Sequence, residues 1–222
     1  MLIIGGTGSG KSYFILSLIT ALLRSNAVLS IIDPKNADLA DLATVMPDVY
    51  SDKDEIIKCL TQFEEDMINQ SEAMKQHPNY KTGEDYSYLG LPPHFLIFDE
   101  FVAFMAMLDR KQSDAVGSSM MRIAMLGRQA GYFLILACQR PDSKYFGDGV
   151  RDQFNFRVAL GRVSDLGYTM AFGETDKEFF LKDIKGRGYV DAGVGVISEF
   201  YTPLVPEGYD FIAEIRRLAQ SP

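Results

Sequence analysis

Eight residues near the start of the chain have the types and spacing that hold a phosphate group: Gly5-Gly6-Thr7-Gly8-Ser9-Gly10-Lys11-Ser12. They fit the pattern G-x-x-x-x-G-K-[ST] at every fixed position. Glycine lets the backbone approach phosphate closely and point N–H groups at it. Lys11 is expected to reach the β- and γ-phosphates of a nucleotide, and the Ser12 hydroxyl to hold Mg²⁺. The chemistry indicated is the binding of ATP with Mg²⁺.

A pair of acids provides a second chemical signal. Asp99 and Glu100 follow the apolar run Phe95–Phe98. In a nucleotide hydrolase the first acid binds Mg²⁺ and the second polarises the attacking water. An acidic pair at the end of a strand also occurs in many proteins without such a role, so this interpretation depends on the phosphate-binding loop. Together the two motifs predict ATP hydrolysis.

Two further polar residues are candidates for the same site. Gln139 follows the apolar run Tyr132–Cys138, where its amide could sense the γ-phosphate or position water; the alternative is a simple hydrogen-bonding role at a strand end. Arg128 precedes that run, and a guanidinium there could stabilise transition-state charge at a neighbouring subunit's nucleotide. The alternative for Arg128 is a surface arginine that complements the dipole at the end of a helix.

Strands and helices must position these side chains, and their patterns alternate along the chain. Besides Leu2–Ile4 before the loop, buried strands are predicted at Ala27–Ile32, Phe95–Phe98, Tyr132–Cys138 and Phe156–Leu160. Amphipathic helices are predicted after the loop, from Asp52 to about His77, and over roughly Ser113–Gln129, with a loop over Asn79–Pro93.

This alternation predicts an α/β fold with a mostly parallel sheet flanked by helices. The tail predicts an edge hairpin within Gly186–Tyr201 and a terminal helix over Phe211–Ala219. Because Ala27–Ile32 comes between the loop strand and the Asp99 strand in sequence, we expect it to lie between them in the sheet. That arrangement is the RecA-like, additional-strand class of P-loop ATPases.

Composition narrows the possible functions. The 222 residues are 47% hydrophobic and 23% charged, which is ordinary for a globular domain. A net charge of −8 argues against a simple basic DNA-binding surface, but not against DNA in a channel lined by a few basic residues. Cys59 and Cys138 lack metal-site spacing and are expected to be reduced structural thiols. No apolar run approaches the length of about 20 residues that spans a bilayer.

Four segments taken in order carry a family resemblance: the loop GGTGSGKS, Asp33-Pro34-Lys35, the run FLIFDEF, and AGYFLILACQRP from Ala130 to Pro141. With them the chain resembles the FtsK/SpoIIIE branch of the FtsK–HerA ATPases. The resemblance implies that Lys11 and Ser12 bind phosphate and Mg²⁺, that Asp99 and Glu100 are the metal-binding and water-activating acids, and that Gln139 is a sensor. It also implies that Arg128 acts in trans across a hexamer interface.

The resemblance further implies one motor domain over residues 1–222, which we expect to be excised from a longer parent protein. The motor is expected to be cytoplasmic, and the parent anchored to the membrane by an upstream region. The tail departs from chromosome-segregating FtsK, since residues 186–222 predict a hairpin and a helix and not a winged-helix module, and the chain looks like the FtsK-like coupling proteins of conjugative elements in Gram-positive bacteria.

These features predict an ATP-hydrolysing DNA translocase that works in conjugative transfer or in chromosome or plasmid segregation. Its partners would be that machinery, double-stranded DNA in the pore of a ring, and further copies of itself in a hexamer. Lys144 and Arg151 are the basic candidates for the pore, although Lys144 could be a solvated loop lysine and Arg151 could face the nucleotide. Protein secretion by an FtsK-like ATPase is the alternative, and a non-catalytic nucleotide-binding module is a third possibility.

Overall fold

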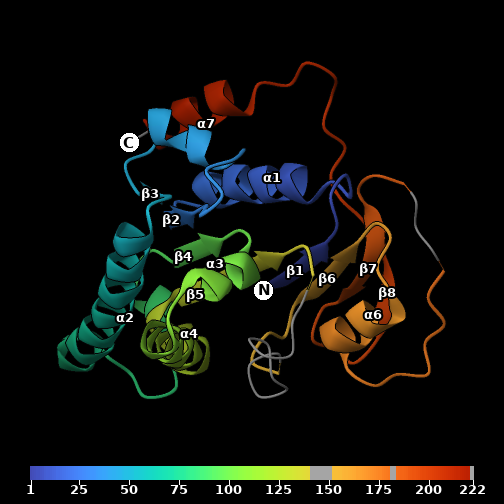
Figure 1. The fold of residues 1–222 in the computed structure, drawn as a ribbon. Helices are drawn as coiled ribbons and strands as arrows, with labels where there is room; N and C mark the ends of the chain where they lie inside the picture. The colour runs from blue at the N-terminus through green and yellow to red at the C-terminus, as the bar shows by residue number, and fades with distance from the viewer. Residues whose placement is uncertain (141–151, 181–183, 221–222) are drawn as a thin grey trace.

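The backbone forms one eight-stranded sheet with the order β3-β2-β4-β5-β1-β6-β7-β8 (Figure 1). The computed structural model describes residues 1–140, 152–180 and 184–220. Its strands are β1 Leu2–Gly5, β2 Val28–Ile32, β3 Val49–Tyr50, β4 His94–Phe98, β5 Tyr132–Cys138, β6 Arg157–Leu160, β7 Arg187–Asp191 and β8 Ile197–Tyr201. Its helices are α1 Lys11–Arg24, α2 Lys53–Gln76, α3 Phe101–Met107, α4 Arg110–Ala130, α6 Asp165–Phe172 and α7 Phe211–Ala219, with short 3-10 turns η1 Ala40–Thr44 and η2 Tyr86–Leu89.

The neighbouring pairs from β3 to β6 are parallel, whereas β6-β7 and β7-β8 are antiparallel. The mostly parallel sheet, the hairpin of β7 and β8, and the terminal helix are confirmed.

One expectation about strand order is wrong. A strand does lie between β1 and β4, but it is β5 and not Ala27–Ile32, because β2 pairs on the far side of β4. Chain order does not determine this arrangement, since each crossover helix can return its strand to either side of a neighbour.

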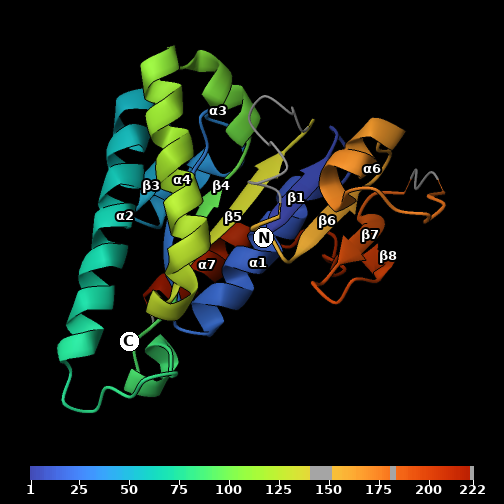
Figure 2. The ribbon, with the colours of Figure 1, turned by 90° about the horizontal axis from the view of Figure 1, so that it is seen from below.

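Helices cover both faces of the sheet (Figures 1 and 2). On one face, α1 and α7 pack over strand residues such as Ile3, Ile31 and Val158. On the other face, α2, α3, α4 and α6 pack over residues such as Leu2 and Phe98. Successive residues of β1 therefore enter opposite cores, which explains why a central parallel strand is apolar at every position.

Several elements were missed by the sequence patterns. The short strand β3 and the helices α3 and α6 were not predicted, and the loop over Asn79–Pro93 contains η2. Helix α4 begins at Arg110, three residues before the predicted start, because Asp109 and Gln112 form a reciprocal capping box. The polar residues between Arg110 and Ser113 hide this first turn from an analysis of apolar periodicity.

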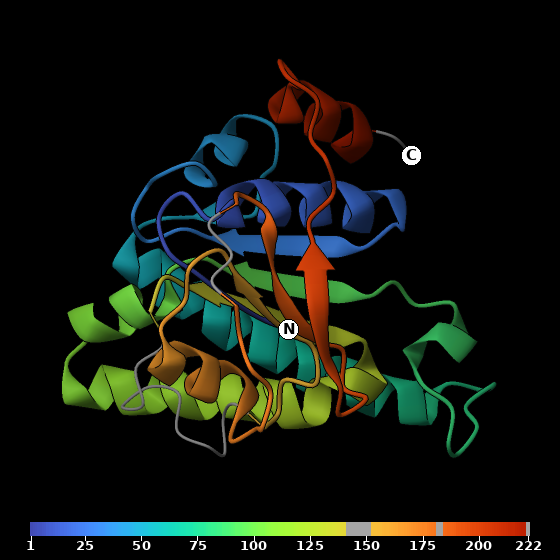
Figure 3. The same ribbon diagram turned by 90° about the vertical axis from the view of Figure 1, so that its right-hand side faces the viewer.

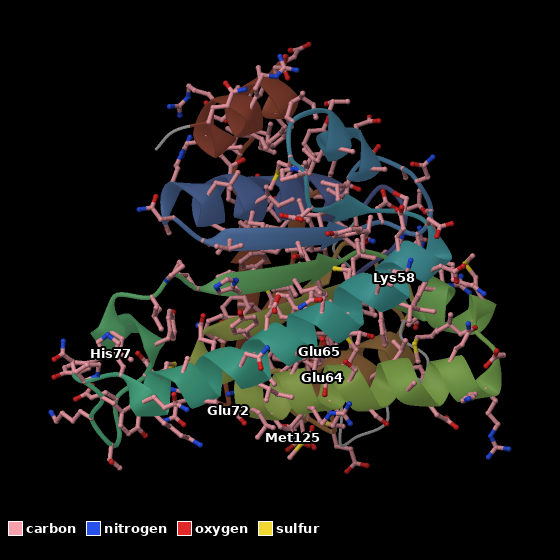
Figure 4. The ribbon with its side chains drawn as sticks, turned by 90° about the vertical axis from the view of Figure 1, so that its left-hand side faces the viewer. Lys58, Glu64, Glu65, Glu72, His77 and Met125 are labelled. Carbon is pink, nitrogen blue, oxygen red and sulfur yellow. The ribbon has the colours of Figure 1, made fainter. Side chains whose placement is uncertain are left out.

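Helices α2 and α4 lie side by side on the sheet (Figure 2). The Arg122 guanidinium of α4 pairs with the Glu64 carboxylate of α2, with 3.0 Å between Nη2 and Oε2. Figure 4 shows Glu64 where α2 passes α4. This pair holds the pKa of Glu64 below its usual range. The ion pair therefore links α2 to α4, and α4 leads directly into β5.

Two glycines of α4 provide a matched test of how closely this helix packs. A Cβ at Gly127 would lie 2.2 Å from the carbonyl oxygen of Tyr132, whereas at Gly117 the nearest atom, Met105 Cε, is 4.0 Å away. We expect Gly127→Ala to lower the free energy of unfolding by about 1–3 kcal/mol through overpacking. Gly117→Ala should raise it by about 0.5–1 kcal/mol, because alanine is the better helix former. Urea unfolding of both variants measures the contrast; equal effects would contradict it.

Candidate functional site

Three neighbouring parallel strands end at one edge of the sheet, and the site lies just beyond their ends. The register aligns Ile4 of β1 with Cys138 of β5, and Leu136 of β5 with Phe98 of β4. The phosphate-binding loop follows β1, Asp99-Glu100 follows β4, and Gln139 follows β5. The carboxyl edge of a parallel sheet is where ligands of such folds bind.

The loop takes the conformation that its glycines allow. Gly8 and Gly10 have φ values of 81° and 94°, in the left-handed region that other residues avoid. Lys11 is the first residue of α1, so the loop ends at a helix N-terminus. A Cβ at Gly6 or Gly8 would meet nothing within 4 Å. The glycine-rich side of the loop is therefore open to a ligand.

The Lys11 ammonium lies between the two predicted acids. It donates a hydrogen bond to Asp99 Oδ1 and another to Glu100 Oε1, the latter at 2.7 Å. All three side chains are buried. Burial by itself would lower the pKa of Lys11, but the attraction of both carboxylates outweighs it and raises that pKa. The ammonium is therefore charged at neutral pH, as phosphate binding requires.

The two acids titrate in opposite directions although they are adjacent in sequence. Burial raises the pKa of Asp99, and the ion pair with Lys11 offsets only part of that effect. Burial also acts to raise the pKa of Glu100, but Lys11 and Lys35 together outweigh it and lower that pKa. Glu100 is thus an ionised carboxylate at neutral pH, which is the state of a general base.

Glu100 is held by its backbone as well as by its charges. Its φ of 53° is in the left-handed region, which is uncommon for a residue with a side chain and costs on the order of 1–3 kcal/mol. Lys35 Nζ lies 3.2 Å from Glu100 Oε2. The buried Asp33 shapes the loop that carries Lys35, because its carboxylate accepts the backbone N–H of Ala37 at 2.9 Å. The sequence motif Asp33-Pro34-Lys35 therefore has a structural role beside the acids, one that the sequence pattern did not assign.

One cavity of about 320 Å³ joins these groups, and its lining includes Lys11, Ser12, Asp99, Glu100 and Gln139. The residues fit a nucleotide phosphate with Mg²⁺. A hydroxyl and a carboxylate oxygen are ligands that Mg²⁺ prefers. In the same loop, the glycines leave open space and Lys11 supplies a cation, and these are the features that bind an anion.

Arg128 is a predicted site residue that does not line the cavity around Lys11. It is exposed near the end of α4, just before β5 begins, whereas Gln139 follows the end of β5. Arg128 lines a different cavity, together with Met1 and Tyr132 at the amino edge of the sheet. It cannot serve the nucleotide site of its own chain. Lys144 and Arg151, the predicted pore residues, lie outside the described residues.

The two cysteines do not supply a nucleophile. Cys138 ends β5 close to the acids, and burial raises the pKa of its thiol to about 12. Cys59 of α2 is also buried, with a pKa of about 12 for the same reason. Both thiols are free and stay protonated at neutral pH.

Several known proteins are similar to this chain. Residues 1–88 match the family model described as the FtsK/SpoIIIE family. The FtsK domain-containing protein YdcQ of Bacillus subtilis is 54% identical over 217 residues, which are 97% of this chain and 45% of YdcQ. The ESX secretion system protein YukB of B. subtilis is 28% identical over 90% of this chain and 14% of YukB. The DNA translocase FtsK of Streptococcus pneumoniae is 25% identical over 85% of this chain and 26% of FtsK.

Solved structures show the same architecture. The pCW3 conjugation coupling protein TcpA has a TM-score of 0.84 at 20% identity, over 99% of this chain and 64% of that chain. The type VII secretion ATPase EccC of Thermomonospora curvata has a TM-score of 0.72 at 21% identity, over 99% of this chain and 28% of that chain.

The fold and the phosphate-binding loop are those of P-loop proteins with an additional strand, β5, between the loop strand β1 and the acid strand β4. The chain carries a domain of the FtsK/SpoIIIE family. It spans less than half the length of the curated relatives named above. In the described part of the chain, no helix is both long enough and apolar enough to cross a membrane.

Two substitutions separate nucleotide binding from turnover. We expect Lys11→Ala to weaken MgATP binding at least about tenfold, because it removes a charged hydrogen-bond donor to phosphate. Glu100→Gln should retain binding and lose about 10²–10⁴-fold in kcat, because an amide cannot take a proton from water. Calorimetric titration and a phosphate-release assay measure the two effects. Hydrolysis at the parental rate by Glu100→Gln would show that the base is another residue.

Proposed function

We propose that this chain hydrolyses ATP with the residues that its carboxyl-edge cavity brings together. Lys11 binds the β- and γ-phosphates, while Ser12 and Asp99 hold Mg²⁺, which neutralises charge that develops on the phosphates. Glu100 polarises the attacking water and accepts its proton, and Gln139 senses the γ-phosphate. The observation that carries this proposal is the buried Lys11–Asp99–Glu100 cluster beside an open glycine loop.

Nucleotide binding would rearrange this cluster. The Lys11 ammonium now donates hydrogen bonds to both carboxylates, and a bound phosphate would compete with them as an acceptor. When Lys11 turns to phosphate, Asp99 becomes available to Mg²⁺ and Glu100 keeps Lys35 as a cationic partner. The general base would thus be freed by the substrate on which it acts.

We propose further that hydrolysis drives translocation of DNA, in conjugative transfer or in chromosome or plasmid segregation. The Asp33-Pro34-Lys35 motif and the segment from Ala130 to Pro141 support this, as do relatives named DNA translocase FtsK. The fold likeness to a conjugation coupling protein is consistent with it. Protein secretion is the second candidate, supported by the likeness to YukB and by the fold likeness to EccC.

The response of the ATPase to DNA distinguishes the two candidates. We expect double-stranded DNA to raise the rate of ATP hydrolysis, with little dependence on sequence, since contacts with backbone phosphates carry no sequence information. Raising the salt concentration should weaken this stimulation steeply, because phosphate contacts release counterions. Heparin at equal charge is the control for a nonspecific polyanion effect. A rate that DNA leaves unchanged would favour the secretion candidate.

The position of Arg128 supports assembly into a ring, which we propose is a hexamer. Strand β5 has seven residues, and at about 3.3 Å per residue it separates the two edges of the sheet by roughly 20 Å. An exposed guanidinium that far from its own phosphates can meet a nucleotide only on another subunit. Such an arginine is worth about 10³–10⁵ in kcat in other phosphoryl-transfer enzymes.

Mixed assemblies test action in trans. Arg128→Ala subunits keep an intact nucleotide site, and Lys11→Ala subunits keep an intact arginine. Each variant alone should be nearly inactive, while an equal mixture should recover part of the parental rate at interfaces that hold both groups. Activity per subunit should also rise with protein concentration. A mixture no more active than its components, together with a rate independent of concentration, would contradict the action of Arg128 in trans.

A further inference from the structure

A second lysine reaches Glu100 from a different part of the sheet. Lys35 follows β2, and its ammonium lies 3.2 Å from Oε2 of Glu100. Lys11 follows β1 and donates to the other oxygen, Oε1, at 2.7 Å. In the sheet, β2 lies on one side of the Glu100 strand β4, and β1 lies beyond β5 on the other side. Each oxygen of this carboxylate therefore has its own cation, and the two cations come from opposite sides of the strand.

The surroundings of the two lysines differ in charge. Lys11 is buried at the start of α1, within the loop that is built for phosphate, so a bound phosphate competes directly for its ammonium. Lys35 lines the same cavity from the side of β2, together with Asp33 and Asp38. Negative charge on these two carboxylates disfavours a phosphate beside Lys35. A nucleotide therefore draws away Lys11 and leaves Lys35 paired with Glu100.

The backbone that carries Lys35 is held by one buried carboxylate. Asp33 is buried and accepts the backbone N–H groups of Lys35 at 3.2 Å, Ala37 at 2.9 Å and Ala40 at 3.2 Å. The ring of Pro34 fixes a further backbone angle between Asp33 and Lys35. The place from which the Lys35 side chain starts is thus set by its own short motif.

The segment that follows this motif is anchored to α1. Leu39 and Leu42 are buried in the core that also contains Phe14 and Ile15 of α1. Figure 3 shows η1, in lighter blue, next to α1. The loop that presents Lys35 therefore keeps its position relative to the helix that begins at Lys11.

The backbone of Glu100 is also constrained, whereas the orientation of its carboxylate depends on charged partners. Asp99 Oδ1 accepts the backbone N–H of Glu100 at 3.0 Å, and the φ of Glu100 is 53°. Its carboxylate is paired with the ammonium groups of Lys11 and Lys35. Once phosphate has drawn Lys11 away, Lys35 is the one of these two cations that still fixes Oε2. A carboxylate held by one oxygen presents the other to its surroundings.

We propose that Lys35 is the positioning residue of the general base: it holds Oε2 of Glu100 so that Oε1 faces the attacking water. This inference rests on the proposed ATPase function. The proton of the water passes to Oε1, and the water oxygen bonds to the γ-phosphorus. The bond from that phosphorus to the bridging oxygen of the β-phosphate breaks, which releases ADP and phosphate. Lys35 acts on this reaction only through Glu100.

The first test separates turnover from binding. Lys35→Met removes the cation, and because the side chain is 43% exposed, we expect the fold to tolerate this change. The kcat for ATP hydrolysis should fall about ten- to hundredfold, as for the loss of a hydrogen bond to a charged group. The affinity for the nonhydrolysable analogue AMP-PNP with Mg²⁺, measured by calorimetry, should stay within about twofold of the parental value.

Two further variants complete this comparison. Lys35→Arg keeps a cation with hydrogen-bond donors at the same place and should recover most of the parental kcat. Lys58→Met replaces an exposed lysine of α2, labelled in Figure 4, and should leave both kcat and affinity unchanged.

The second test asks whether Lys35 acts through Glu100. Lys35→Met is combined with Glu100→Gln in a double-mutant cycle, and single-turnover quench-flow with radiolabelled ATP measures the residual rate. A positioning residue has no effect once the base that it positions is gone. In the Glu100→Gln background, Lys35→Met should therefore change the rate by less than about twofold.

The outcomes distinguish this inference from the proposed function. A loss of kcat in Lys35→Met that Lys35→Arg restores, and that disappears in the Glu100→Gln background, supports the assignment. It is overturned if Lys35→Met is as fast as the parent or faster, if AMP-PNP binding weakens as much as kcat falls, or if Lys35→Met slows Glu100→Gln as much as it slows the parent. In these cases the proposed ATPase stands as long as Glu100→Gln alone is slow. Hydrolysis by Glu100→Gln at the parental rate overturns both the assigned base and its positioning residue.

Discussion

An ammonium and two carboxylates are buried together at the carboxyl edge of the sheet, and the architecture around them is constrained by the need to keep them paired. Removing an unpaired ion from water costs several kcal/mol even after relaxation. Lys11 offsets this cost for Asp99 and Glu100 at once, since it donates to both. The pairing requires β1 and β4 to run in the same direction with one strand between them, as the parallel pairing of β5 with both strands provides. It also leaves the site charged and poised for a ligand that competes for the ammonium.

Strand β5 also connects the two edges of the sheet that carry predicted site residues. It is buried along almost its whole length, and it joins the amino edge, where Arg128 lies, to the carboxyl edge, where Gln139 lines the phosphate cavity. If Arg128 acts on a neighbouring subunit, the same strand would relate the state of one nucleotide to that of the next. Gly127, packed against the Tyr132 carbonyl, keeps the end of α4 close to the beginning of this strand.

The antiparallel hairpin and the tail have a part in the site that the strand-and-helix pattern does not suggest. Gly186 contacts the phosphate-binding loop directly, and α7 returns the chain to α1, the helix that begins at Lys11. Elements from the two ends of the chain therefore enclose one region.

Patterns among near neighbours in the chain are enough to predict several elements and the chemistry of the phosphate-binding loop. The loop from Gly5 to Ser12 carries its own conformation in its glycines, the acids follow an apolar run of strand length, and β5 and α7 were predicted with the bounds they have. The strand order, in contrast, depends on the packing of the whole sheet, because the sequence of an apolar strand does not specify on which side of a neighbouring strand it pairs. Only the tertiary structure brought Lys35 to Glu100 and Lys185 to Tyr13, contacts that span about 65 and 170 residues of chain. Such contacts arise from packing of the whole sheet and its helices, which no window of neighbouring residues contains.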